Sequence, residues 1–279
     1  MNEKQCRDLF SELLNKKVYS FTILEGGLSN VSFAINNAYV MRVPSSYVQP
    51  FVNYRNEENI LNVISSLKMS EKIVYFDSKN GIKISKYIHG GFTYDETPSN
   101  EQIIMTAKAV KKLHRQKIKV KNYFSPLERL EHYRSYSLKE KLDQRYEKKI
   151  VRLMGSYLEK EELILCHNDL VRGNLLYKFD DVVVIDWEYA GMNSPYFDIA
   201  SFISENNLDE HQKELFLQSY FGSKLNNLKR KKVNTFVNFN DILWYYWALM
   251  MHKNTENAVF LMIAEIKKQS VLEDMKRNK

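Results

Sequence analysis

The chain has little of what several classes of protein depend on. It contains two cysteines, Cys6 and Cys166, and neither lies in a Cys-x-x-Cys or Cys/His spacing that would indicate a zinc site or a redox pair. We expect both to be reduced thiols, with Cys166 a small buried residue. The apolar run at residues 242–251 is too short to span a bilayer, and the polar residues 1–8 lack the apolar core of a secretory signal. The sequence therefore predicts a cytoplasmic protein without membrane insertion.

The excess of basic residues is modest, with a formal net charge of +7. Basic clusters can bind the phosphates of nucleic acid. Here residues 229–232 lack interleaved aromatics, and Lys111 and Lys112 lie on a predicted helix whose apolar face is elsewhere. We interpret both clusters as solvated surface and expect no nucleic-acid partner. A modest positive field would still favour small anionic substrates such as nucleotide phosphates.

Hydrophobic periodicity predicts an α+β fold with two lobes. Helical spacing over residues 3–14 precedes five strand candidates, with a helix at about 52–66 inserted between the third and the fourth. These candidates are residues 19–24, 31–36, 39–43, 73–77 and 82–87. From about residue 101 the pattern is mostly helical, apart from two short strands around residue 169. We predict lobes at residues 1–88 and 89–279.

The most informative segment is His-Asn-Asp-Leu-Val-Arg-Gly-Asn at residues 167–174, followed by an apolar run at 182–185 that stops at Asp186. Phosphoryl transfer needs one carboxylate at the attacking hydroxyl and oxygen ligands for Mg²⁺. Asp169, Asn174 and Asp186 supply that set. A lone Asp-x₄-Asn is usually a solvated turn, and many buried strands end in Asp, so the order of the pieces carries the inference. Together they indicate a phosphotransferase, or an inactive relative that keeps the loop.

This loop resembles the protein-kinase catalytic loop, in which an Asp precedes an Asn by the same interval. Asp186 stands where the metal-binding Asp of the Asp-Phe-Gly motif would stand. Trp187 and Glu188 follow it here in place of Phe-Gly. That difference points to the small-molecule branch of the superfamily, the aminoglycoside phosphotransferases and choline kinases.

A second candidate segment, residues 26–30, joins the first two strand candidates. Gly26 and Gly27 would let backbone N–H groups approach a phosphate, and Ser29 and Asn30 can donate hydrogen bonds. Gly-Gly followed by Ser or Asn is equally typical of an ordinary hairpin. The segment resembles the Gly-Gly-x-Ser-Asn phosphate loop of choline kinases, which favours a nucleotide site.

Arg42 lies within the apolar strand candidate at residues 39–43, where a protein kinase has the lysine that contacts the α- and β-phosphates. An unpaired guanidinium would be costly to bury, so we expect a carboxylate partner. Glu57 shares its helix face with apolar residues, whereas Glu58 points to the side and stays the alternative.

The connection between the predicted lobes contains the paired glycines Gly90 and Gly91, which can absorb changes of dihedral angle at a hinge. A nucleotide would lie at this hinge. Lys86, Tyr87 and Ile88 would then belong to its binding site.

The C-terminal part carries a candidate acceptor site. Trp244 and Trp247 lie at i and i+3 on one face of a predicted helix, and their ring faces attract quaternary ammonium groups. Aromatics at this spacing are also common in cores. Glu205 follows Asp198 by two helical turns on the same face, and Tyr189 lies between Asp186 and that helix. A carboxylate beside an aromatic box would suit a cation.

From residue 26 to residue 247 these motifs resemble the choline/ethanolamine kinase family, above all its bacterial choline kinases. The resemblance implies a bilobal protein-kinase-like fold, with a five-stranded N-lobe that carries one inserted helix and a larger, mainly helical C-lobe. The N-lobe would bind the nucleotide, and the C-lobe would hold the catalytic and substrate-binding residues. ATP and Mg²⁺ would be the cofactors, Asp169 the catalytic base, and Asn174 and Asp186 the metal ligands.

The same resemblance implies that Glu205 faces the ammonium group of the substrate, that Trp244 and Trp247 line its pocket, and that Asp198 braces the catalytic loop. Choline is the first expectation for the acceptor. The residues between the tryptophans, Tyr245 and Tyr246, are bulkier than those often found there, which leaves ethanolamine open. An aminoglycoside is a further alternative, in which acidic residues would dominate over aromatics.

Overall fold

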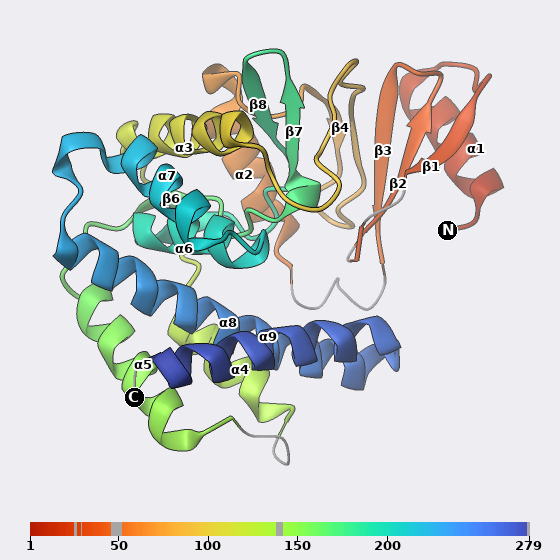
Figure 1. Cartoon of the computed structure of the whole chain (residues 1–279). Coiled ribbons are helices and arrows are strands. Elements are labelled where there is room, and N and C mark those ends of the chain that lie inside the picture. Colours follow the sequence, from red (N-terminus) through yellow and green to blue (C-terminus); the bar gives the residue numbers. More distant parts are fainter. Residues whose placement is uncertain (25–26, 29, 46–51, 138–141, 278–279) are drawn as a thin grey trace. The chain divides into compact units, whose positions relative to one another are not determined.

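The structure is a computed structural model that describes residues 1–24, 27–28, 30–45, 52–137 and 142–277 (Figure 1). The chain divides into two compact units, residues 1–93 with 172–189, and residues 94–171 with 190–279. The first unit therefore takes in a later segment, the one that carries Asn174 and Asp186. The predicted lobe boundary between residues 88 and 89 stays a prediction.

The first unit contains the predicted five-stranded sheet. All neighbouring strands are antiparallel, in the order β1-β2-β3-β5-β4. The strands are β1 (Phe21–Leu24), β2 (Asn30–Ile35), β3 (Tyr39–Pro44), β4 (Ile73–Phe76) and β5 (Lys83–Lys86). Helix α1 (Glu3–Leu14) precedes the sheet, and helix α2 (Tyr54–Ile64), continued by η2 (Ser65–Leu67), is inserted between β3 and β4 as predicted.

The core of this unit lies between α1 and one face of the sheet. Cys6 and Phe10 of α1 share it with residues of alternate parity on the strands, among them Met41 and Ile84. Because successive side chains of a strand point to opposite faces, Arg42 belongs to the other face. The sheet thus buries an apolar layer on one side, and its other side carries the charged pair Arg42 and Lys83.

A short hairpin completes the first unit. The 3-10 helix η3 (Arg172–Asn174) leads into β7 (Leu175–Lys178), which pairs antiparallel with β8 (Asp181–Val184). Phe92 and Tyr177 exchange backbone hydrogen bonds, so the hairpin is joined to the residues after β5.

The second unit is mostly helical, as predicted. Its helices are α3 (Asn100–Arg115), α4 (Pro126–Ser135), α5 (Gln144–Leu158), α6 (Pro195–Glu205), α7 (Glu210–Phe221), η4 (Gly222–Lys224), α8 (Asn227–Thr255) and α9 (Ala258–Arg277). The chain also pairs β6 (Ile164–Cys166) with β9 (Gly191–Asn193). The expectation of two short strands around residue 169 was therefore incomplete, since the structure has β6 and β9 here and β7 and β8 in the first unit.

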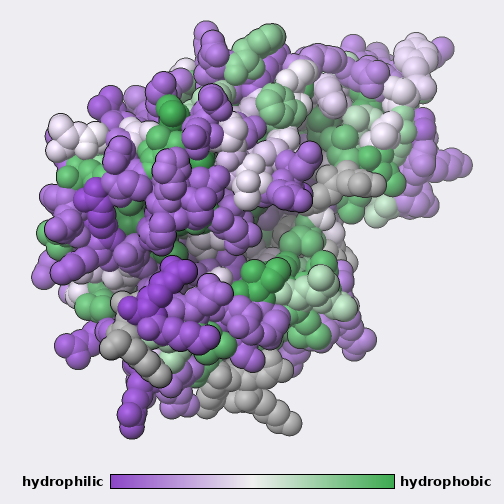
Figure 2. Space-filling view, viewed as in Figure 1, coloured by the Kyte–Doolittle hydropathy of each residue, from purple (hydrophilic) through white to green (hydrophobic). Residues whose placement is uncertain are grey.

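The apolar run at residues 242–251 lies within the buried part of the long helix α8. Residues 242–251 are all buried, because α8 packs against α4, α5, α6 and α9. The face of the molecule in Figure 2 is mostly hydrophilic, with hydrophobic residues in small groups. Within the described ranges, no helix combines the length and the apolar character needed to cross a membrane.

Candidate functional site

The β7–β8 hairpin brings the two predicted metal ligands to one of its ends. Leu175 pairs with Val184, and just beyond this pair the Ile185 N–H donates to the Asn174 carbonyl at 2.9 Å. Asp186 therefore leaves the hairpin next to Asn174. Its φ of 62° lies in the left-handed region, which Asp adopts more readily than most residues.

Trp187 anchors this turn. Its side chain is fully buried, and the indole Nε1 donates to the carbonyl of Val184 at 2.9 Å. The departure from the Phe-Gly pair of protein kinases thus has a structural role, because the indole ties the turn after Asp186 back to the strand before it.

Arg42 forms the predicted pair with Glu57. Its Nη1 and Nη2 lie 2.7 and 2.6 Å from Glu57 Oε1 and Oε2, a bidentate contact between buried side chains. Nη1 also lies 2.7 Å from Asp186 Oδ1. The choice of Glu57 over Glu58 is confirmed, and Arg42 links α2 to the predicted metal ligand Asp186.

Lys83 and Glu71 extend this charged cluster and were missed in the sequence. Lys83 Nζ lies 3.2 Å from Glu57 Oε1 and 2.7 Å from Glu71 Oε1, and both partners of the second contact are buried. Lys83 is the cross-strand neighbour of Arg42. Only the register of β3 with β5 could have revealed it, and a sequence does not contain that register.

Asn30 joins two carboxylates. It is the first residue of β2 and buried, and its Nδ2 lies 3.3 Å from Asp186 Oδ2 and 3.1 Å from Glu188 Oε2. Glu188 was not predicted as a site residue, although its position two residues after Asp186 was a usable signal. The turn before Asn30 requires glycine, because a Cβ on Gly27 would come within 2.4 Å of the Asn30 carbonyl oxygen. Gly26 and Ser29 lie outside the described residues.

The cluster carries an excess of negative charge. Two cations, Arg42 and Lys83, face four carboxylates, those of Glu57, Glu71, Asp186 and Glu188. Burial, and next the charge of Asp186, raise the pKa of Glu188 well above its usual range. Among the described residues, the buried Asn30 Oδ1 has no hydrogen-bond partner. Surplus carboxylates and an unpartnered amide oxygen are ligands that suit Mg²⁺.

The connection after β5 is placed differently from expectation in one respect. Lys86 pairs across the sheet with Tyr39, and its Nζ lies 3.1 Å from the Tyr39 hydroxyl, on the face opposite Arg42. Tyr87 donates its N–H to the Ala38 carbonyl, and Ile88 accepts from the Gly91 N–H. The Lys86 side chain therefore points away from the Arg42 face, and the assignment of residues 86–88 to a nucleotide site stays a prediction.

In the second unit, α6 holds the loop that carries Asp169. Asp198 accepts the His167 N–H on Oδ2 at 2.9 Å and the Asn168 N–H on Oδ1 at 2.6 Å. Asn168 has a φ of 68°, a left-handed conformation that Asn tolerates. The Asp169 side chain stays partly exposed while its neighbours are buried. The predicted bracing role of Asp198 agrees with these contacts.

Ser201 of α6 and Asn206, the residue that follows α6, also support this loop. The Leu170 N–H donates to Ser201 Oγ at 3.0 Å, and Asn206 Nδ2 donates to the Leu170 carbonyl at 2.8 Å. Neither was predicted. Ser201 could have been found, because it lies at i+3 from Asp198 on the same helix face.

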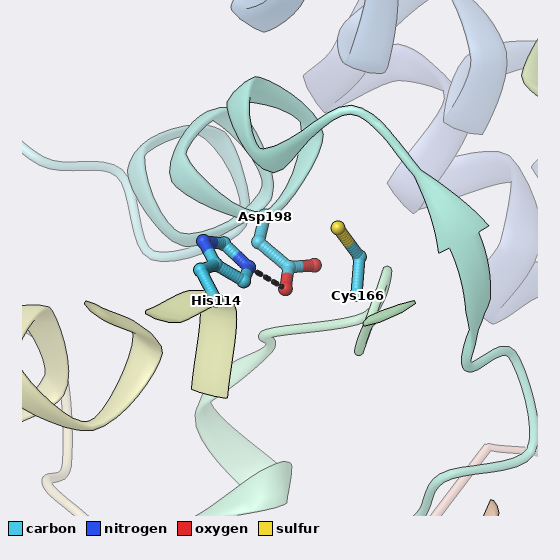
Figure 3. Close-up of side chains that lie close together, drawn as sticks. All are labelled: His114, Cys166 and Asp198. Atoms are coloured by element: carbon cyan, nitrogen blue, oxygen red, sulfur yellow. Dashed lines mark hydrogen bonds and ion pairs between the residues drawn. The ribbon is translucent and has the colours of Figure 1, made fainter. Parts of the chain in front are cut away.

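His114, Cys166 and Asp198 converge in a buried cluster with the composition of a metal site (Figure 3). His114 Nε2 lies 2.9 Å from Asp198 Oδ2, so both Asp198 oxygens already accept N–H groups. Burial, and next the charge of Asp198, raise the pKa of Cys166 well above its usual range, which keeps it a thiol. We therefore interpret the cluster as a structural brace.

Replacing Asp198 by asparagine should lower Tm by at least about 5 °C, because one buried carboxylate serves two loop N–H groups and a histidine. Burial alone would raise the pKa of Asp198, but the hydrogen bond from His114 brings it below its usual range. The carboxylate therefore stabilises the fold above its unfolded pKa, and this contribution is lost as the pH falls below about 4.

Thermal unfolding of both proteins between pH 3 and pH 7 checks this prediction. The difference in Tm between wild type and D198N should shrink as the pH falls through about 4 and below. The exposed Asp8 of α1, changed to asparagine, is the control and should leave Tm unchanged. A D198N protein as stable as wild type at pH 7 would contradict the bracing role.

The two tryptophans of the predicted aromatic box contact each other, and a third ring joins them, while their role in binding an acceptor stays a prediction. Trp244 and Trp247 meet edge to face with centroids 5.6 Å apart, and Trp247 meets Phe260 of α9 in the same way at 5.6 Å. The tryptophans are 5% and 9% exposed, so they are largely packed. Phe260 had no signal in the sequence, because its contact depends on how α9 folds back on α8. Tyr189 is buried and belongs to the first unit.

Glu205 has a partner that the sequence analysis did not foresee. Lys267 Nζ of α9 lies 2.7 Å from Glu205 Oε1 and 3.1 Å from Asp241 Oδ1 of α8. The group has two carboxylates and one ammonium, so one net negative charge remains at the predicted acceptor site.

The sequence profile of the choline/ethanolamine kinase family matches residues 21–271. Protein LicA of Haemophilus influenzae is 28% identical over 255 residues, which cover 83% of this chain and 74% of that protein. The fold of the present chain is similar to that of a choline/ethanolamine kinase family protein from Mesorhizobium loti. The TM-score is 0.82 at 23% identity, over 98% of this chain and 94% of that one. The choline kinase LicA from Streptococcus pneumoniae gives a TM-score of 0.79 at 23% identity, over 97% and 99%.

Proposed function

Because this chain belongs to the choline/ethanolamine kinase family and is a small-molecule kinase, we propose that it transfers the γ-phosphoryl group of ATP to the hydroxyl of choline. Membership of this family supports phosphorylation of an amino-alcohol. The choice of choline depends on one observation, the three rings of Trp244, Trp247 and Phe260 where α8 meets α9.

Aromatic faces suit a quaternary ammonium group, because it has no N–H to donate and is attracted to the ring quadrupole. A primary ammonium would prefer carboxylate oxygens, and Glu205 with Asp241 could supply them, so ethanolamine is the second candidate. An aminoglycoside carries several ammonium groups. The group of Glu205, Asp241 and Lys267 has only one net negative charge, which suits several ammonium groups less well than one.

Asp169 is proposed as the group that accepts the hydrogen bond, and then the proton, of the substrate hydroxyl. Its side chain is partly exposed, while the backbone on both sides of it is tied to α6. A carboxylate fixed in this way loses little freedom when substrate arrives. Positioning of this kind supplies much of the rate in phosphoryl transfer.

The charged cluster of the first unit is proposed as the nucleotide and metal site. Asp186, Asn174 and Glu188 would hold Mg²⁺, and a bound Mg²⁺ would neutralise phosphate charge. Arg42 is kept in place by Glu57, and its buried Nε has no hydrogen-bond partner among the described residues. Its guanidinium, the Asn30 side chain and the backbone of Gly27 are the groups we assign to the phosphates.

Turnover of ATP with Mg²⁺, followed as ADP release, tests the proposal with choline, ethanolamine, kanamycin or no acceptor. We expect kcat/KM for choline to exceed that for ethanolamine by at least about tenfold. W247L should raise KM for choline about tenfold or more with a smaller change in kcat. The buried Phe10 of α1 is the control, since F10L should lower stability and leave this KM unchanged.

Three outcomes would redirect the assignment. Turnover with kanamycin alone would mean that Trp244 and Trp247 only pack in the core and bind no acceptor. Equal use of ethanolamine would leave only the amino-alcohol class. ADP release that no acceptor increases would mean that choline is not the substrate.

A further inference from the structure

Lys267 occupies a position where an apolar residue is expected. The buried residues of α9 are Phe260, Ala264, Lys267 and Val271, at the spacing of one helix face, and α9 packs against α8. A lysine on such a face is unfavourable unless its ammonium is paired and hydrogen-bonded.

Two other helices supply the partners of this ammonium. Lys267 Nζ lies 2.7 Å from Glu205 Oε1 and 2.9 Å from Ser204 Oγ, both on α6, and 3.1 Å from Asp241 Oδ1 on α8. Ser204 Oγ in turn donates to Asp241 Oδ1 at 2.5 Å. The ammonium is therefore fixed from two sides, and its position determines where the Glu205 carboxylate lies.

This charged group lies along the same helix contact as the aromatic box. Asp241 precedes Trp244 by one helical turn, about 4.5 Å along α8, and Lys267 follows Phe260 by two turns on α9. Of the three charged side chains, Glu205 is the most exposed, at 14%, against 8% for Asp241 and 7% for Lys267. Glu205 is thus the carboxylate that an acceptor would reach first.

We propose that Lys267 is a positioning residue of the acceptor site, which holds the Glu205 carboxylate in place and ionised, so that the negative charge offered to a monocationic acceptor lies on Glu205. The inference rests on the proposed function, which it deepens by assigning charge selectivity to a residue outside the aromatic box. Burial raises the pKa of the Glu205 carboxyl, and the Lys267 ammonium is the first group that opposes this rise.

Other titratable groups near Glu205 act on it less directly. Asp241 of α8 is a second carboxylate and favours protonation of Glu205. Beyond Asp241, Tyr146 of α5 donates to Asp274 of α9, and the charge of Asp241 adds to the rise in the pKa of Tyr146 that begins with burial. Without Lys267, two buried carboxylates would face each other with no cation, and we expect Glu205 to bind a proton, because burial already raises its pKa.

The test is K267M, with KM for choline measured from pH 6 to pH 9. Choline is permanently charged and ATP with Mg²⁺ is the same for both proteins, so a difference between the two pH profiles belongs to the protein. For the variant we expect KM at pH 7 to rise about tenfold with little change in kcat, and the inflection of KM against pH to move up by about one unit or more. An unchanged profile would overturn the inference.

A matched control lies next in the chain. Lys268 is 44% exposed and pairs with Glu265 at 3.9 Å, so K268M removes the same charge outside the site and should behave as wild type. In an E205Q background the addition of K267M should leave KM unchanged, because Lys267 acts through Glu205. A further rise of KM in that background would also overturn the inference. Because position 205 is then an uncharged glutamine, removal of Lys267 cannot act there through a carboxylate left unpaired.

A titration without acceptor separates this inference from the proposed function. The tryptophan fluorescence of wild type and K267M is followed from pH 4 to pH 9. Its inflection should move up in K267M as the inflection of KM does, because Asp241, which shares Lys267 with Glu205, lies one helical turn before Trp244 on α8. Shifted titrations with no use of choline would retain Lys267 as the residue that controls Glu205 and reject choline. Identical titrations would reject the role of Lys267 whatever the acceptor.

Discussion

Replacing Asp169 by alanine is expected to lower kcat at least about a thousandfold while KM for ATP changes by less than about threefold. The carboxylate is the group we assign to the substrate hydroxyl, and the nucleotide groups we assign lie on other residues. The loop itself should survive the change. Its backbone is held by Asp198, Ser201 and Asn206, and these contacts do not use the Asp169 side chain.

The measurement is steady-state ADP release with choline and Mg²⁺, together with Tm for each protein. D169N is the closer substitution and should show a loss of similar size, because an amide cannot accept the proton. Asp180, exposed in the turn between β7 and β8, supplies the control D180N, which should turn over normally. Near-normal turnover of D169A would refute the role of Asp169.

Local sequence patterns predicted those parts of the molecule whose residues lie close together in the chain. Asp169, Asn174 and Asp186 were found because one loop and one strand end carry them. The pairing of Arg42 with Glu57 was found because an apolar strand that contains an arginine needs a carboxylate, and only Glu57 shares its helix face with apolar residues. The five-stranded sheet and the mostly helical second unit were predicted from the period of the hydrophobic residues and the length of each segment.

The partners that were missed come from distant segments. His114 of α3 contacts Asp198, Asn193 of β9 donates to Asn168, and Lys83 meets Glu57 through strand register. Strand β9 itself, Gly191–Asn193, contains residues that strands usually avoid and forms by pairing with β6. Tertiary contact decided these features, and a single sequence does not reveal it.

Glu205 shows how such a partner changes an interpretation. Its position two turns after Asp198 predicted a carboxylate that faces a cation, and taken alone it would be a buried, unpaired charge. The pairing with Lys267, far along the chain on α9, removes that difficulty and lowers the net charge of the site to that of one carboxylate. If Glu205 receives the acceptor as we propose, the choice between acceptors depends on a lysine that belongs to no motif.

The second large effect is expected for D186N, which should lower kcat about a hundredfold or more and raise the Mg²⁺ concentration for half-maximal rate at least about tenfold. Asparagine keeps the size of the side chain and its contact with Arg42 through one oxygen, but it removes a charge from the four carboxylates of the charged cluster, Glu57, Glu71, Asp186 and Glu188. A divalent cation would then bind a site with less negative charge and one ligand weakened.

Titration of Mg²⁺ at saturating ATP and choline distinguishes this loss from a structural one, because only a ligand role makes part of the lost rate return at high Mg²⁺. The matched control is E58Q. It removes one charge from the helix that carries Glu57, but Glu57 and not Glu58 is the buried partner of Arg42. E58Q should keep the wild-type Mg²⁺ dependence. If D186N kept it too, Asp186 would serve to hold Arg42, and the metal would have to be assigned to Glu188 and Asn174 without it.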